Sequence, residues 1–69
     1  MEKVMVVEAN YGSPVTVVRL SRTDCGLVPC GLTIIPVGAR HEFSIPIDGK
    51  TLFEFEDDGH ADIYIREPA

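Results

Sequence analysis

Glycine and proline divide the chain into short segments, and their spacing limits the possible folds more than any other sequence feature. Six glycines and five prolines are distributed over 69 residues, so the chain is interrupted about every dozen residues or less. Between these interruptions, no window places apolar residues at the three-and-four spacing of an amphipathic helix. The sequence therefore predicts an all-β protein.

Six segments have strand character. The first three are rich in β-branched residues, and the last three alternate apolar with polar residues. The predicted strands span residues 4–8, 15–21, 32–37, 41–45, 51–56 and 61–66. A chain of this length buries only about 60% of the surface that its unfolded form exposes. We therefore expect residues 1–69 to form a single domain, a small six-stranded sandwich or barrel that a homo-oligomer could complete.

The turn at Asp48-Gly49 has two possible registers, and the side-chain pattern distinguishes them. A two-residue hairpin loop would place Phe43 opposite Glu54, which mixes apolar and charged faces. A three-residue loop with Gly49 in the left-handed conformation places Phe43 opposite Phe53 instead. The second register keeps the apolar side chains together and is the one we predict.

The same three-residue construction fits the turn at residues 57–59. The last three strands then form a C-terminal three-stranded antiparallel meander with one apolar face and one solvent-facing side. The predicted apolar face contains His41, Phe43, Ile45, Phe53, Phe55, Ala61, Ile63 and Ile65.

The solvent-facing side of this meander carries the predicted partner-binding site. Glu42, Glu54 and Asp62 would lie side by side on adjacent strands, with Leu52 and Tyr64 as apolar neighbours. Opposed like charges destabilise a sheet, so this row of carboxylates suggests a ligand. A basic protein surface and a Ca²⁺ or Mg²⁺ ion are two candidates. The simplest alternative is a solvated face on which Arg40 and Arg66 relieve the repulsion.

The net charge restricts the class of partner. Eleven acidic residues oppose six basic ones, for a net charge of −5. Such a surface repels nucleic acid and anionic membranes. We predict a small acidic protein-binding or self-assembling module without catalytic activity, whose partner is a protein with a basic surface. An acidic inhibitor of a nucleic-acid-binding protein is an alternative of the same kind.

Cysteine and histidine provide a second class of function. Cys25 and Cys30 could form a disulfide, remain free thiols or, with His41 and His60, bind zinc, although their spacing matches no common zinc pattern. A metal- or thiol-dependent protein that uses Cys25 and Cys30, or the carboxylate row, therefore remains an alternative. His60 beside Glu56 could act as a base, but no nucleophile is predicted nearby. We predict no enzyme activity and no cofactor.

The N-terminal segment lacks the basic start and the long apolar stretch of a signal peptide, and no apolar run is long enough for a membrane helix. These features favour a cytoplasmic location. In size, acidity and strand content the chain resembles small accessory proteins encoded by bacteriophages and mobile elements. This resemblance rests on composition and assigns no role to any residue.

Overall fold

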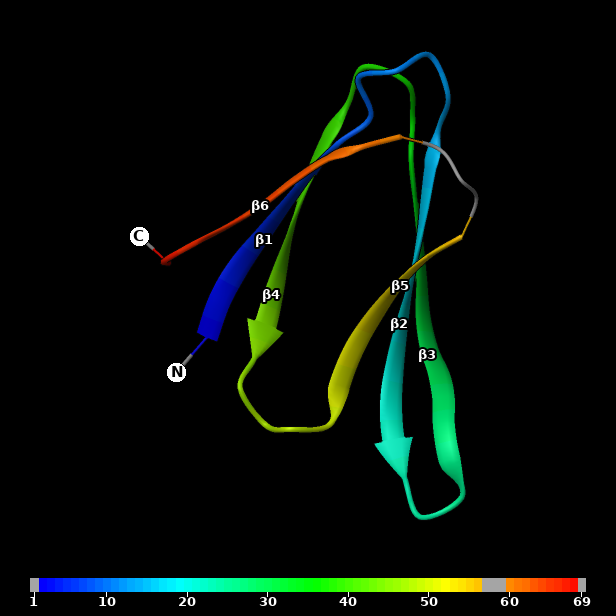
Figure 1. Ribbon diagram of the computed structural model, residues 1–69, viewed down its shortest axis with the longest axis vertical. Coiled ribbons are helices and arrows are strands. Elements are labelled where there is room, and N and C mark those ends of the chain that lie inside the picture. The colour runs from blue at the N-terminus through cyan, green and yellow to red at the C-terminus, as the bar shows by residue number, and fades with distance from the viewer. Residues whose placement is uncertain (1, 57–59, 69) are drawn as a thin grey trace.

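The computed structural model describes residues 2–56 and 60–68, which form six strands and no helix (Figure 1). The strands are β1 (Glu2–Glu8), β2 (Val15–Thr23), β3 (Gly26–Ile35), β4 (Arg40–Pro46), β5 (Thr51–Glu56) and β6 (Asp62–Arg66). The predicted all-β fold with six strands is confirmed.

The strands form two three-stranded antiparallel sheets. Sheet A has the order β4-β1-β6, and sheet B has the order β3-β2-β5. Figure 1 shows sheet A on the left and sheet B on the right, with the tip of the β2–β3 hairpin projecting beyond the other strands. The two layers form the predicted sandwich.

The central positions are occupied by the two strands whose sequences are apolar on both faces. In β1, Val7 faces the interior and Val6 the outer side of sheet A, yet both are fully buried. In β2, Val17 faces the interior, and Val18, on the outer side of sheet B, is only 7% exposed. A central strand has neighbours on both sides whose side chains cover its outer face, so these sequences are suited to the middle of a sheet.

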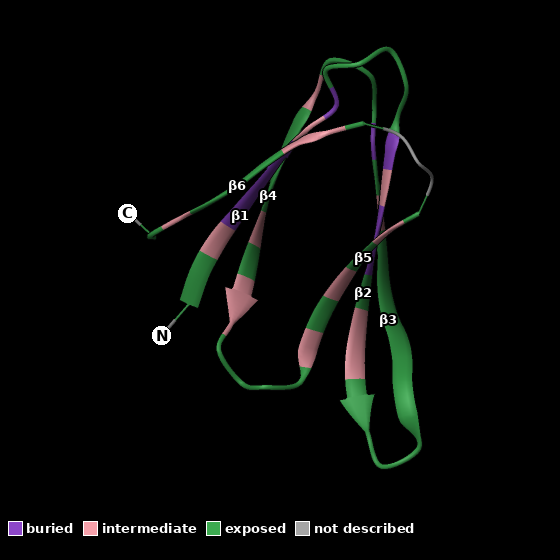
Figure 2. Cartoon of the chain, viewed as in Figure 1, coloured by how far each residue is buried: buried purple, intermediate pink, exposed green. Residues whose placement is uncertain are grey.

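The interior of the sandwich lies at one end of the two layers, where the buried segments of β1 and β2 gather (Figure 2). Its buried members come from β1, β2, β3 and the segment after β1, and aromatic and aliphatic side chains of β4 and β5 pack around them. The buried cluster contains Met5, Val7, Ala9, Val15, Val17 and Ile35.

The predicted C-terminal meander is wrong. Strands β4 and β6 each pair with β1, and β5 pairs with β2 in the other sheet. The chain therefore crosses between the layers after β4 and again after β5. The prediction assumed that consecutive strands are hydrogen-bonded neighbours, whereas in this fold β1 and β2 each require two flanking strands.

The turn chemistry at Gly49 was predicted correctly although the pairing was not. Gly49 has φ 72°, in the left-handed region. The Asp48 carboxylate accepts hydrogen bonds from the backbone amides of Lys50 (2.8 Å) and Thr51 (3.0 Å) and from the Thr51 hydroxyl (3.0 Å). These hydrogen bonds fix the conformation of the loop that connects β4 in sheet A to β5 in sheet B. The second predicted turn, at residues 57–59, lies outside the described residues.

The predicted apolar face was only partly right. Five of its eight residues pack against the interior, namely Phe43, Ile45, Phe53, Phe55 and Ala61, whereas His41, Ile63 and Ile65 are exposed. Phe43 and Phe53 do contact each other, with ring centroids 5.5 Å apart. They meet across the interior, because Phe43 belongs to sheet A and Phe53 to sheet B. Alternation thus assigned both rings to the interior, while the pairing of the strands decided how they approach.

Strand β3 begins six residues earlier than predicted, because Pro29 and Gly31 lie within it rather than in a loop. Its pairing with β2 shifts between Arg19 and Leu20, whose partners are Gly31 and Pro29, so Cys30 is the extra residue of a β-bulge. Strand β3 is at an edge of sheet B, where the missing proline amide is tolerated. The result is a long hairpin arm that is exposed along most of β3 (Figure 2).

Candidate functional site

The five predicted partner-binding residues do not form one surface. Glu42, Asp62 and Tyr64 lie on the outer face of sheet A, opposite Val6 or Glu8 of β1. Glu54 and Leu52 lie on the outer face of sheet B, opposite Val18 and Leu20 of β2. The predicted row of three carboxylates is therefore absent, because β5 is in a different sheet from β4 and β6.

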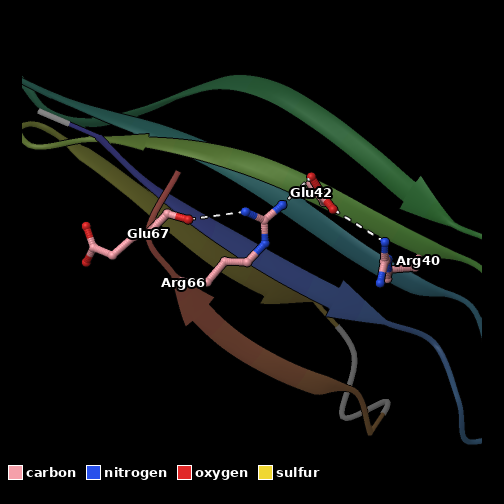
Figure 3. A network of polar contacts seen from close by, with 4 residues as sticks. All are labelled: Arg40, Glu42, Arg66 and Glu67. Carbon is pink, nitrogen blue, oxygen red and sulfur yellow. Dashed lines mark hydrogen bonds and ion pairs between the residues drawn. The ribbon is translucent and has the colours of Figure 1, made fainter. Parts of the chain in front are cut away.

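Arginines neutralise Glu42. Its carboxylate lies 2.9 Å from Arg66 and 3.5 Å from Arg40 (Figure 3). The Arg66 guanidinium also donates a hydrogen bond to the backbone carbonyl of Glu67 at 3.2 Å. Arg40 and Arg66 were expected to relieve the repulsion among the predicted carboxylates. In the structure both form ion pairs with Glu42.

Asp62 holds Asn10 and Tyr11, which follow β1, against the outer face of sheet A through hydrogen bonds. Its carboxylate accepts hydrogen bonds from the Asn10 amide (3.0 Å) and the Tyr11 hydroxyl (2.7 Å). The Asn10 bond is the main cause that lowers the pKa of Asp62 below its usual 3.8, and the Tyr11 bond adds to it. The same contact with Asp62 raises the pKa of Tyr11 above 10.0. Asp62 is therefore engaged within the chain.

The cysteines and histidines are dispersed. Cys25 lies in the turn of the β2–β3 hairpin, Cys30 lies in the bulge, and both are exposed free thiols. His41 packs on Phe43 with ring centroids 4.4 Å apart, and His60 lies 5.9 Å from the Tyr11 ring. Among residues 2–56 and 60–68, no three His, Cys, Asp or Glu side chains are grouped as metal ligands.

The surface that the sequence did not reveal is the outer face of sheet B, formed by alternate residues of β2, β3 and β5. Leu32 and Ile34 of β3 are 63% and 60% exposed. Leu27 and Leu52 are exposed as well, while Val18, the neighbour of Leu32 in the central strand, is buried. We call this surface the sheet B apolar face; it consists of Val18, Leu20, Leu27, Pro29, Leu32, Ile34 and Leu52. It was missed because the sequence placed Leu27 and Pro29 in a loop and left the partners of β3 undefined.

Charged residues lie at the two ends of the sheet B apolar face. Glu54 and Glu56 of β5 lie beside Val18 and Thr16, toward one end of β2. Arg22 lies at the other end of β2, where its backbone amide donates a hydrogen bond of 2.8 Å to the carbonyl of Lys50. One end of the face therefore carries two carboxylates, and the other carries Arg22 and Lys50 together with Asp24 and Asp48.

The molecule is more open than its length requires. A compact chain of 69 residues has a radius of gyration of about 11 Å, whereas this one has 12.5 Å. Its accessible surface is 4674 Å², against about 4,300 Å² for a monomer of this mass. The three principal extents are 38, 29 and 14 Å. Part of the apolar surface that a closed domain would bury is thus available for contact.

The chain matches no known family model, no curated protein and no solved structure. In the part of the chain that the structure describes, no helix has the length and apolar character needed to cross a bilayer.

Proposed function

We propose that the protein is a self-assembling module that acts by binding rather than by catalysis, and that two copies associate through the sheet B apolar face. The observation that carries this proposal is the exposure of Leu32 and Ile34 beside Leu27 and Leu52 on one continuous sheet surface. Contiguous apolar surface of this kind is uncommon on monomers and is typical of interaction sites.

The charges at the two ends of the face favour a second copy as the partner. A two-fold axis that runs parallel to the sheet, above its outer face and perpendicular to the strands, places the Glu56 end of each copy over the Arg22 and Lys50 end of the other. Glu56 of one copy then lies over the Lys50 end of its partner. Because this symmetry is isologous, the complementary contact occurs twice.

The same axis also matches the apolar residues of β3. It places Ile34 of one copy over Leu27 of the other, and Leu32 over Pro29, since these residues lie at equal distances on either side of the row that contains Arg19. A two-fold axis along the strands would instead place Glu54 and Glu56 over the leucine and isoleucine of β3. The first arrangement places one carboxylate per copy, Glu54, over an apolar side chain, Leu52, whereas the second places two there, so the first costs less.

The size of the face indicates a reversible dimer. Three strands about 4.8 Å apart and about 30 Å long give a flat area of roughly 400 Å² per copy. Two copies therefore bury on the order of 800–1,000 Å² in total, at the lower limit for a specific interface. We expect monomer and dimer to exchange as the concentration changes.

Sedimentation equilibrium over a range of concentrations tests the proposal. The wild type is expected to shift from monomer to dimer, and Ile34→Glu to remain monomeric. Tyr64→Glu introduces the same charge at an exposed residue on the outer face of sheet A and is expected to dimerise normally. A wild type that stays monomeric at every concentration would falsify the proposal, as would equal effects of the two substitutions.

A charge exchange tests the symmetry. Lys50→Glu and Glu56→Lys alone should each weaken the dimer by up to about fivefold, the scale of exposed ion pairs. The double variant should recover the wild-type affinity, because the contact is restored with its signs reversed. Additive losses in the double variant would mean that these residues do not meet across the interface.

A further inference from the structure

A cavity opens between the two sheets on the side where β3 and β4 form their edges. It has a volume of about 340 Å³ and is lined by residues of all four neighbouring strands, β2, β3, β4 and β5. This volume is in the range of small-molecule sites. The cavity opens toward the inner side of sheet B and shares one lining residue, Leu32, with the sheet B apolar face.

Arg19 is the unusual member of the lining. Alternation along β2 places it on the inner side, two residues after the buried Val17 and opposite Phe53 and Gly31 of the flanking strands. Such a position in a sandwich normally holds an apolar side chain. Within residues 2–56 and 60–68, the cations that form ion pairs are Lys3, Arg40 and Arg66, so no described carboxylate pairs with Arg19.

Gly31 provides the space beside this arginine. A methyl group at Gly31 would lie 3.6 Å from Cβ of Arg19, so any larger side chain would extend into the cavity next to the guanidinium. The adjacent bulge at Cys30 further bends the edge strand at this point. Bulges commonly occur beside binding sites, where they reorient side chains.

The opposite wall is aromatic. His41 packs against Phe43 with ring centroids 4.4 Å apart and ring planes tilted by 51°, and Phe43 in turn contacts Phe53 at 5.5 Å. Thr33 also lines the cavity and carries a hydroxyl group. Glu42 lines it as well, but its carboxylate is paired with Arg40 and Arg66. The cavity therefore combines the guanidinium of Arg19, a hydroxyl group and an imidazole with an aromatic surface that favours a flat apolar group.

We propose that this cavity binds a small carboxylate that has an apolar ring or chain. The guanidinium of Arg19 holds the carboxylate through two parallel hydrogen bonds, the geometry for which arginine is suited. The apolar part of the ligand packs against Phe43 and Phe53, and Thr33 and His41 are within the same cavity to donate further hydrogen bonds.

An NMR titration of the ¹⁵N-labelled protein with phenylacetate tests this site. Amide signals of Gly31, Thr33 and Phe43 are expected to shift and to saturate at millimolar phenylacetate. Phenylacetamide, which has the same shape without the charge, should bind at least tenfold more weakly, because it lacks the charge-assisted pair.

Substitutions at two arginines of β2 separate a specific site from general attraction of anions. Arg19→Gln should lower the affinity for phenylacetate at least tenfold, and Arg19→Lys should give an intermediate loss because the charge is kept without the planar fork. Arg22→Gln removes the same charge three residues away, on the outer face of sheet B, and should leave the affinity unchanged.

Three results would overturn the proposal: no shifts at the cavity amides, equal binding of phenylacetamide, or equal losses in Arg19→Gln and Arg22→Gln. Each variant is checked by its amide spectrum without ligand, which should remain that of the folded wild type because both arginines are exposed.

Discussion

Asn10 relieves the repulsion between two carboxylates that the fold places opposite each other. Glu8 and Asp62 are cross-strand partners in β1 and β6, an arrangement that destabilises a sheet. The Asn10 amide donates a hydrogen bond to each of them, at 3.1 Å and 3.0 Å. The Tyr11 hydroxyl adds a third bond to the pair. A like-charge pair thus becomes the attachment point of the loop after β1.

These bonds predict an acid-sensitive stability. The pKa values of Asp62 and Asp48 are lowered by the hydrogen bonds that each carboxylate accepts. A group with a lowered pKa contributes stability that is present above its unfolded value, 3.8 for aspartate, and is lost as pH falls through the folded value. The melting temperature should therefore decrease as pH falls below 3.8, and Asp62→Asn should show a smaller decrease. Asp24→Asn, at the hairpin tip, is the control that should retain the wild-type profile.

At the scale of elements, the connections between strands decide the fold. Only β2 and β3 are consecutive strands that pair with each other; every other described strand pairs with partners distant in sequence. Backbone hydrogen bonds to Ala9 hold the segment between β3 and β4 in place. In one of them the Gly38 amide donates to the Ala9 carbonyl at 2.7 Å. The loop after β4 is held by Asp48. Both loops lead the chain across to the other layer.

The loop after β4 provides a prediction for a single glycine. Gly49→Ala should destabilise the protein by about 1 kcal/mol, because a Cβ atom is unfavourable in the left-handed conformation. Gly49→Asn should cost less, since asparagine tolerates this conformation better than alanine. Urea unfolding of the two variants measures the difference. Equal stability of Gly49→Ala and the wild type would mean that the loop does not need this conformation.

At the scale of the whole molecule, a small interior supports two extended layers. The fully enclosed side chains are few, and they lie near one end of the sandwich. The β2–β3 arm and the sheet B apolar face extend beyond this interior, and the cavity at β3 and β4 borders it at Val17. A domain of this size has only a small margin of stability, so binding partners or ligands would add to it measurably.

Neighbouring isoleucines of β3 test how the stability is distributed. Ile35 is 2% exposed and Ile34 is 60% exposed. Ile35→Ala should cost about 2–5 kcal/mol, the scale for a buried aliphatic truncation, and could unfold the monomer. Ile34→Ala should change the stability by about 0.5 kcal/mol or less. Denaturant unfolding at concentrations where the protein is monomeric compares them, and similar costs would contradict the assigned interior.

The sequence determined the strands apart from the first six residues of β3, the alternation of their side chains, and the turn at Gly49. These features are local: the period of two assigns each side chain to a face, and a turn needs a particular residue at a particular conformation. The strands that contain Val6 and Val18 are also apolar on both faces. This pattern is typical of central strands, and it could have placed each of the two strands at the centre of a sheet.

Only the tertiary structure decided which strands are neighbours. Every strand offers the same backbone donors and acceptors along its edges, so alternation cannot choose between partners. The need to flank both β1 and β2 made that choice. It separated Glu42, Asp62 and Tyr64 from Glu54 and Leu52, and it created the sheet B apolar face and the cavity beside Arg19, which arise from contacts between distant segments.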